Sequence, residues 1–109
     1  MKILVAVRTQ EKNEIVFILQ KAAVLVEIVD ILSDIEKITD SFEIALIDED
    51  FDGLRRGWQL AFKLRNERPL AKIVMIVRNN PKHEYLLLYD VTLGLPMSED
   101  ELLGEINTR

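Results

Sequence analysis

The acidic run at residues 48–52 is the part of this sequence best suited to chemistry. Asp48 ends the apolar segment FEIALID, and three more carboxylates follow it before Gly53. Carboxylates can bind a divalent cation, accept a phosphoryl group or pair with arginine. Open α/β sheets bind their ligands at the carboxyl ends of their strands. We therefore expect Asp48 to mark a functional site at such an edge.

The composition is typical of a water-soluble globular protein. The chain has 109 residues, 49% of them hydrophobic and 30% charged, which predicts one domain spanning residues 1–109. The net charge of −5 argues against direct binding of nucleic acid. The absence of cysteine excludes disulfides and thiol chemistry. Because no apolar run is long enough for a signal peptide or a membrane span, we expect a cytoplasmic protein without membrane contact.

Short apolar segments alternate along the chain with segments of helical periodicity. This alternation predicts an α/β fold in which a parallel sheet has helices on both faces. Right-handed crossovers leave few topologies, and the flavodoxin-like strand order 2-1-3-4-5 suits five strands. The predicted strands are Ile3–Val7, Val24–Val29, Phe42–Asp48, Lys72–Val77 and Val91–Leu95.

Several residues predict where helices begin. Ser33 with Glu36, and Ser98 with Glu101, have the spacing of a capping box, in which the two residues satisfy each other's backbone amides. A longer helix is expected from about residue 54 to 66, with Leu54 on its inner face. Proline is favoured in the first helical turn, so Pro81 is a further candidate for a helix start.

The whole chain resembles the receiver domain of bacterial two-component response regulators. FEIALID (42–48) is similar to the third strand of that family, which ends in the phosphoacceptor aspartate, and LPMSEDELL (95–103) is similar to its K-P-F-x-x-x-E-L-L segment. MKILVAV (1–7) and KIVMIV (72–77) resemble its first and fourth strands. The resemblance implies a three-layer flavodoxin-like fold with Asp48 at the phosphoacceptor position.

The residues that support phosphoryl transfer in this family are replaced here. The first-strand acids, which hold Mg²⁺, fall on Val7 and Arg8, the hydroxyl residue falls on Val77, and the lysine before the proline falls on Leu95. The resemblance therefore implies a degenerate form, a pseudo-receiver, that uses no metal or cofactor and is not an enzyme. Arg8 would place a cation where the family places its metal, and would pair directly with Asp48.

Three other interpretations of the same residues stay open. In the first, Asp48 accepts phosphate slowly from a histidine kinase partner. In the second, the chain is a small enzyme or ligand-binding protein of flavodoxin-like fold, although its four glycines form no phosphate-binding loop. In the third, residues 48–53 imitate a calcium loop, but Gln59 stands at the twelfth position, where such a loop needs glutamate.

Residues 85–89 (YLLLY) are five consecutive large apolar side chains. One face of a helix or strand cannot bury all five, so we expect part of this run to bind a protein partner, and a homodimer is the simplest such partner. In the competing interpretation, a shortened helical region has collapsed inward, and the three leucines fill the space it leaves. The predicted interaction surface consists of Tyr85, Leu86, Leu87, Leu88 and Tyr89.

Overall fold

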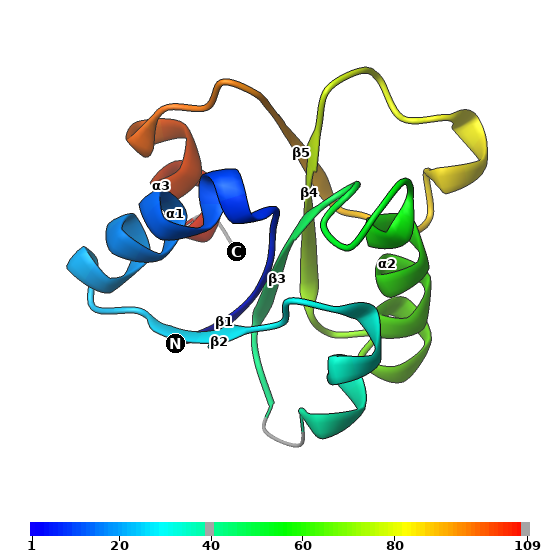
Figure 1. The fold of residues 1–109 in the computed structure, drawn as a ribbon, viewed down its shortest axis with the longest axis horizontal. Helices are drawn as coiled ribbons and strands as arrows, with labels where there is room; N and C mark the ends of the chain where they lie inside the picture. The colour runs from blue at the N-terminus through cyan, green and yellow to red at the C-terminus, as the bar shows by residue number, and fades with distance from the viewer. Residues whose placement is uncertain (39–40, 108–109) are drawn as a thin grey trace.

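The computed structural model describes residues 1–38 and 41–107, and it contains a parallel sheet between two layers of helices (Figure 1). The sheet has five strands in the order β2-β1-β3-β4-β5, and every neighbouring pair is parallel. The predicted α/β fold, strand order and flavodoxin-like topology are thus confirmed. The strands are β1 (Lys2–Ala6), β2 (Leu25–Ile28), β3 (Ile44–Asp48), β4 (Lys72–Val77) and β5 (Val91–Gly94).

Helices cover both faces of the sheet, as Figure 1 shows. One layer contains α1 (Thr9–Lys21) and α3 (Glu99–Asn107), and the other contains α2 (Arg56–Glu67) with the 3₁₀ helix η1 (Leu32–Lys37). A second 3₁₀ helix, η2 (His83–Tyr85), lies in the connection between β4 and β5. Within the described ranges, none of these helices is long and apolar enough to cross a membrane.

The central strands β1, β3 and β4 are apolar along almost their whole length because both of their faces are buried. In β1, Leu4 and Ala6 belong to the core on the α2 side, whereas Ile3 and Val5 belong to the core under α1 and α3. Successive side chains of a strand point to opposite faces, so a central strand needs apolar residues at every position. This requirement explains why the central strand segments are nearly continuous apolar runs in the sequence, whereas the edge strands β2 and β5 each contain a polar residue.

The capping box at the start of α3 forms as predicted. The backbone N–H of Glu101 donates to Ser98 Oγ at 3.1 Å, and the backbone N–H of Ser98 donates to Glu101 Oε1 at 3.1 Å. Each side chain thereby satisfies a first-turn amide that the helix itself leaves without a partner.

The other capping box does not form, and the predicted helix start at Ser33 is wrong. The segment is the 3₁₀ helix η1, which begins at Leu32 with Ile31 at its N-cap. The backbone N–H of Leu32 donates to Asp52 Oδ2 at 2.8 Å, so a contact with the loop after β3 positions this turn. A long-range hydrogen bond therefore replaces the local cap that the sequence pattern predicts.

The predicted long helix is present as α2, but its start and the helix predicted at Pro81 are wrong. The long helix α2 starts at Arg56 rather than near Leu54, and Leu54 is 81% exposed instead of facing inward. Residues Gly53 and Arg55 have positive φ angles of 127° and 62°, which belong to a turn and not to a right-handed helix. Pro81 does not open an α-helix, because the segment after it forms only the three-residue η2.

Candidate functional site

Asp48 is the last residue of β3, so its side chain stands at the carboxyl edge of the sheet. Its side chain has no exposed surface, and it is the one buried charged residue within the described ranges. An ionised carboxylate is stable in such a place only when other groups compensate its charge and satisfy its hydrogen bonds. The groups around Asp48 therefore determine what this site can do.

Arg78 is the principal partner of Asp48. It is the first residue after β4, the strand next to β3, so both side chains reach the same edge of the sheet. Arg78 Nη1 donates to Asp48 Oδ1 at 3.0 Å, and Nη2 donates to Oδ2 at 2.8 Å. The backbone N–H of Asp50 also donates to Oδ1, at 2.8 Å. The two oxygens of the buried carboxylate are thus held by a two-point ion pair and a backbone amide.

Arg8 interacts with Asp48 more weakly than the sequence predicts. Its Nε atom lies 3.7 Å from Asp48 Oδ2, which is an ion-pair distance but too long for a hydrogen bond. Its Nη2 atom donates instead to Glu11 Oε1 at 2.7 Å, within the first turn of α1. Arg8 therefore adds positive charge near Asp48, while its strongest contact is with Glu11.

The carboxylates around each arginine stabilise its charged form. The hydrogen bond to Asp48 raises the pKa of Arg78, and nearby Asp50 and Glu49 raise it further against the opposing effect of burial. Arg78 Nη1 lies 3.6 Å from a carboxylate oxygen of each of these two acids. The hydrogen bond to Glu11 likewise raises the pKa of Arg8. Both guanidinium groups therefore stay charged at any pH at which the domain is folded.

The backbone after β3 is packed tightly against the start of α2. The N–H of Gly57 donates to the carbonyl of Glu49 at 2.9 Å. A Cβ atom at Gly57 would lie 2.1 Å from the carbonyl oxygen of Asp48. Because only glycine permits this approach, Gly57 fixes the position of the backbone that carries Asp48.

The remaining family-equivalent positions are apolar in the structure as well as in the sequence. Val7 and Val77 are buried in the two cores, on opposite faces of the sheet. Leu95 is half-buried beside the core under α1 and α3. None of these three side chains can bind a cation or a phosphoryl oxygen.

The residues around Asp48 fit Mg²⁺ poorly. Magnesium prefers octahedral coordination by oxygen, whereas the groups facing this carboxylate are two guanidinium cations. In the part of the chain that the structure describes, no group of three or more histidine or carboxylate side chains could hold a metal ion. A divalent cation near Asp48 would also be repelled by Arg78 and Arg8.

The acidic residues whose spacing resembles a calcium loop bind backbone amides instead. Asp50 Oδ1 accepts the backbone N–H of Arg55 at 2.8 Å, which shapes the turn before α2. Asp52 Oδ2 accepts the N–H of Leu32, as described above. These carboxylates organise the loop and its contact with η1, and their oxygens do not converge on a common point with those of Asp48 within the described residues.

The apolar run at residues 85–89 divides into a packed part and an exposed part. The ring of Tyr85 stacks on that of Trp58 in α2, with centroids 4.3 Å apart, and the Tyr89 ring meets the same indole edge-on at 5.8 Å. Leu88 is also half-buried against the core on the α2 side. Leu86 and Leu87 are exposed, and 87% of the Leu87 surface is open to solvent.

Arg78 is the functional residue that the sequence analysis missed. Its position carried a usable signal, because it directly follows a predicted strand that is the neighbour of Phe42–Asp48 in the order 2-1-3-4-5. The carboxyl ends of parallel strands meet at one edge of a sheet, so the residues after adjacent strands lie close together. The resemblance draws attention to Val77, the position before Arg78, because the family has its hydroxyl residue there.

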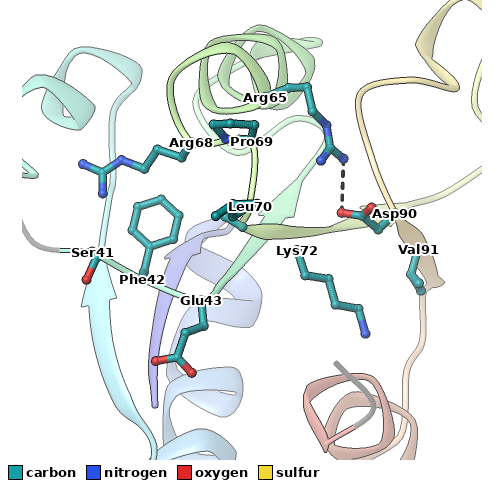
Figure 2. A pocket seen from close by; sticks show the side chains of 11 residues that line it. Ser41, Phe42, Glu43, Arg65, Arg68, Pro69, Leu70, Lys72, Asp90 and Val91 are labelled. Carbon is teal, nitrogen blue, oxygen red and sulfur yellow. Dashed lines mark hydrogen bonds and ion pairs between the residues drawn. The ribbon is translucent and has the colours of Figure 1, made fainter.

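Two hollows lie at opposite edges of the sheet. The larger, of about 960 Å³, is at the amino edge of β3 and β4, far along the strands from Asp48. Figure 2 shows the side chains that line it, among them Arg65, which pairs with Asp90, and the apolar Phe42 and Leu70. The smaller, of about 520 Å³, is bordered by Arg8 and Arg78 and therefore adjoins the Asp48 site.

The fold has clear counterparts among solved structures. A response regulator receiver domain protein (CheY-like) from Methanospirillum hungatei JF-1 aligns over 97% of this chain and 90% of its own, with 24% identity and a TM-score of 0.82. The receiver domain of a sensor histidine kinase from Pseudomonas aeruginosa PAO1, with magnesium coordinated in its active site cleft, aligns over 97% and 93%, with 16% identity and a TM-score of 0.82. A response regulator from Thermotoga maritima in complex with Mg²⁺-BeF aligns over 97% and 96%, with 18% identity and a TM-score of 0.80.

Sequence comparison adds no relative to these structural matches. No family model matches the chain, and no curated protein matches it. The similarity to receiver domains is therefore a similarity of fold.

Proposed function

We propose that this chain is a pseudo-receiver, a signalling module that acts by binding proteins and not by accepting phosphate. The observation that carries the proposal is the state of Asp48, whose side chain has no exposed surface and whose oxygens are held by Arg78. Attack on a phosphorus atom requires a carboxylate oxygen with an open approach and a lone pair that is not already engaged. Neither condition is met while the Arg78 ion pair is in place.

The charges around Asp48 support the same proposal. Phosphoryl transfer depends on cations that stabilise the charge on the transferred oxygens, and in receivers Mg²⁺ supplies most of this effect. Two of the similar structures contain Mg²⁺. In this chain Arg8 and Arg78 provide positive charge, but they neutralise Asp48, Glu11 and their acidic neighbours instead of leaving a cation site.

Protein binding is the function that remains for such a module. Leu86 and Leu87 form an exposed apolar pair on the connection between η2 and β5, and their neighbours Tyr85 and Leu88 pack against the core on the α2 side. Our proposal assigns this surface to a protein partner, with a second copy of the chain as the simplest candidate.

Treatment with a small phosphodonor tests the proposal directly. The chain would be incubated with acetyl phosphate and Mg²⁺, and its intact mass measured, beside a receiver that is known to accept phosphate. We expect the mass to stay that of the unmodified chain. The addition of one phosphoryl group, absent from the Asp48→Asn variant, would establish the alternative instead, a phosphoacceptor served by a histidine kinase.

A further inference from the structure

The cavity of about 520 Å³ beside the Asp48 site lies between α1 and the segment that leads into α3. Its volume falls in the range of small-molecule sites, which is roughly 300–1,000 Å³. Such sites combine a mostly apolar lining with a few charged groups that orient the ligand. This cavity has an apolar part and a charged part. On α1 the charged residues Glu11 and Glu14 precede the apolar residues Ile15 and Ile18.

One part of the cavity wall is apolar. It consists of Ile15 and Ile18 of α1 together with Leu95, Met97 and Leu102, and Ile15 and Leu102 belong to the core beneath it. Leu95 stands where the family resemblance expects a lysine, so a position that would carry positive charge contributes apolar surface instead. A ligand that fills this part should therefore have an apolar body.

The other part of the wall carries charges of both signs. Arg8 and Arg78 provide guanidinium groups, and Glu11 and Glu14 provide carboxylates. A ligand with only a negative charge would be attracted by the two guanidinium groups and repelled by the two carboxylates. A ligand with only a positive charge would be attracted by the carboxylates and repelled by the guanidinium groups. A head group that has both charges complements the whole of this surface.

Two polar atoms at this end of the cavity are buried without a hydrogen-bond partner in the described part of the chain. They are Arg8 Nε, a donor, and Glu11 Oε2, an acceptor. Arg8 Nε lies 3.7 Å from Asp48 Oδ2, an ion-pair distance, so its charge is compensated inside the site. Buried polar atoms are nearly always paired in folded proteins, so Glu11 Oε2 is the atom to which a donor group of a ligand could bind.

We propose that this cavity binds a small amphipathic zwitterion of the apolar α-amino-acid class. Its carboxylate pairs with Arg8 and Arg78, its ammonium group pairs with Glu11 and Glu14, and its side chain packs between Ile18 and Leu95. Arg8 and Glu11 already line the cavity with part of their side chains exposed, and only the buried Glu11 Oε2 has to turn toward the ligand. The inference concerns binding alone and holds whether or not Asp48 accepts phosphate.

Calorimetry with three related probes tests the proposal on the unmodified chain. The probes are L-phenylalanine, 3-phenylpropanoate, which lacks the ammonium group, and 2-phenylethylamine, which lacks the carboxylate. We expect saturable binding of phenylalanine, and binding at least about tenfold weaker for either other probe, the loss typical of one charge-assisted contact. No saturable binding of phenylalanine would overturn the proposal. Equal affinity for all three probes would overturn it too, because the charged groups would then contribute nothing.

Variants on α1 locate the binding. Ile18→Trp places a bulky ring in the cavity and should abolish phenylalanine binding while the chain stays folded by circular dichroism. Phe17→Trp is the matched control, because Phe17 is the next residue of the same helix, is exposed, and does not line the cavity. If folded Ile18→Trp binds phenylalanine as strongly as Phe17→Trp, the ligand lies elsewhere and the proposal fails.

Discussion

Arg78 covers Asp48 at the carboxyl edge of the sheet, with one guanidinium nitrogen on each carboxylate oxygen, at 3.0 and 2.8 Å. The pair is asymmetric in its exposure, since the Asp48 side chain is fully buried and about a quarter of the Arg78 side chain is open to solvent. Arg78 can therefore be removed without leaving a hole in the core. Its removal would, however, leave a negative charge that water reaches poorly.

We accordingly expect Arg78→Ala to destabilise the domain. Breaking a buried ion pair by removing one partner costs about 3–5 kcal/mol, and the Arg8 side chain 3.7 Å from the carboxylate should keep the loss near the lower figure. The free energy of unfolding would be measured by urea denaturation at pH 7. Arg55→Ala is the control, because Arg55 is exposed and its backbone, not its side chain, bonds to Asp50. A loss no larger than that of the control would contradict the structural role of the pair.

Gly57 permits a second test of the same region. A Cβ atom there would overlap the carbonyl oxygen of Asp48 at 2.1 Å and approach the Glu49 Cα at 2.7 Å, so the backbone around the site must shift. We expect Gly57→Ala to lower the free energy of unfolding by at least about 2 kcal/mol, within the range of overpacked sites.

Gly104 provides the matched control for that substitution. It also lies within a helix, α3, but a Cβ atom there would meet no described atom within 4 Å. Gly104→Ala should therefore raise stability by about 0.5–1 kcal/mol, because alanine is favoured over glycine in a helix. If the two substitutions had effects of the same sign, the close approach of α2 to the end of β3 would be in doubt.

The sheet was predictable because its three central strands, β1, β3 and β4, are buried on both faces. Each central strand is a continuous apolar run, and the rules for parallel connections leave few orders for five such runs. The site was predictable only in part. The position of Asp48 follows from the end of its strand, but the preference of Arg8 for Glu11 depends on side-chain geometry that strand order does not specify.

The errors in helix boundaries have a common physical cause. Periodicity and capping patterns report on preferences within the helix, and at η1 and α2 hydrogen bonds to carboxylates outside the helix override them. Asp52 binds the N–H of Leu32 and sets the start of η1, and Asp50 binds the N–H of Arg55 and fixes a turn where a helix was expected. The box at Ser98 formed as predicted because its bonds join exposed residues three apart, with no distant partner involved.

The charge distribution around Asp48 predicts that the domain is indifferent to Mg²⁺. A ligand that binds only the folded state must raise the melting temperature. Two guanidinium groups face the carboxylate that a metal would need, so we expect no change in melting temperature at millimolar Mg²⁺. Differential scanning fluorimetry would measure this, with K⁺ at matched ionic strength as the control. A clear rise specific to Mg²⁺ would show that the arginines can give way to a metal.

The exposed pair Leu86 and Leu87 leads to a prediction about self-association. The structure separates the two interpretations of the apolar run, because Leu88 packs against the core while Leu87 is almost fully exposed. Leu87→Glu should therefore leave the stability within about 0.5 kcal/mol of the unmodified chain, as surface substitutions usually do. Under our proposal, the unmodified chain sediments as a dimer at high micromolar concentration and Leu87→Glu sediments as a folded monomer.

Phe62→Glu is the control for that experiment. Phe62 is also an exposed apolar residue, but it lies on α2 outside the proposed surface, so the variant should still form dimers. Burial of a leucine side chain contributes roughly 1.5–3 kcal/mol, and in a twofold dimer each substitution acts twice, so a carboxylate at position 87 should weaken association strongly. Two results would exclude the homodimer through this surface: a monomeric unmodified chain at high micromolar concentration, or a Leu87→Glu variant that associates as well as Phe62→Glu.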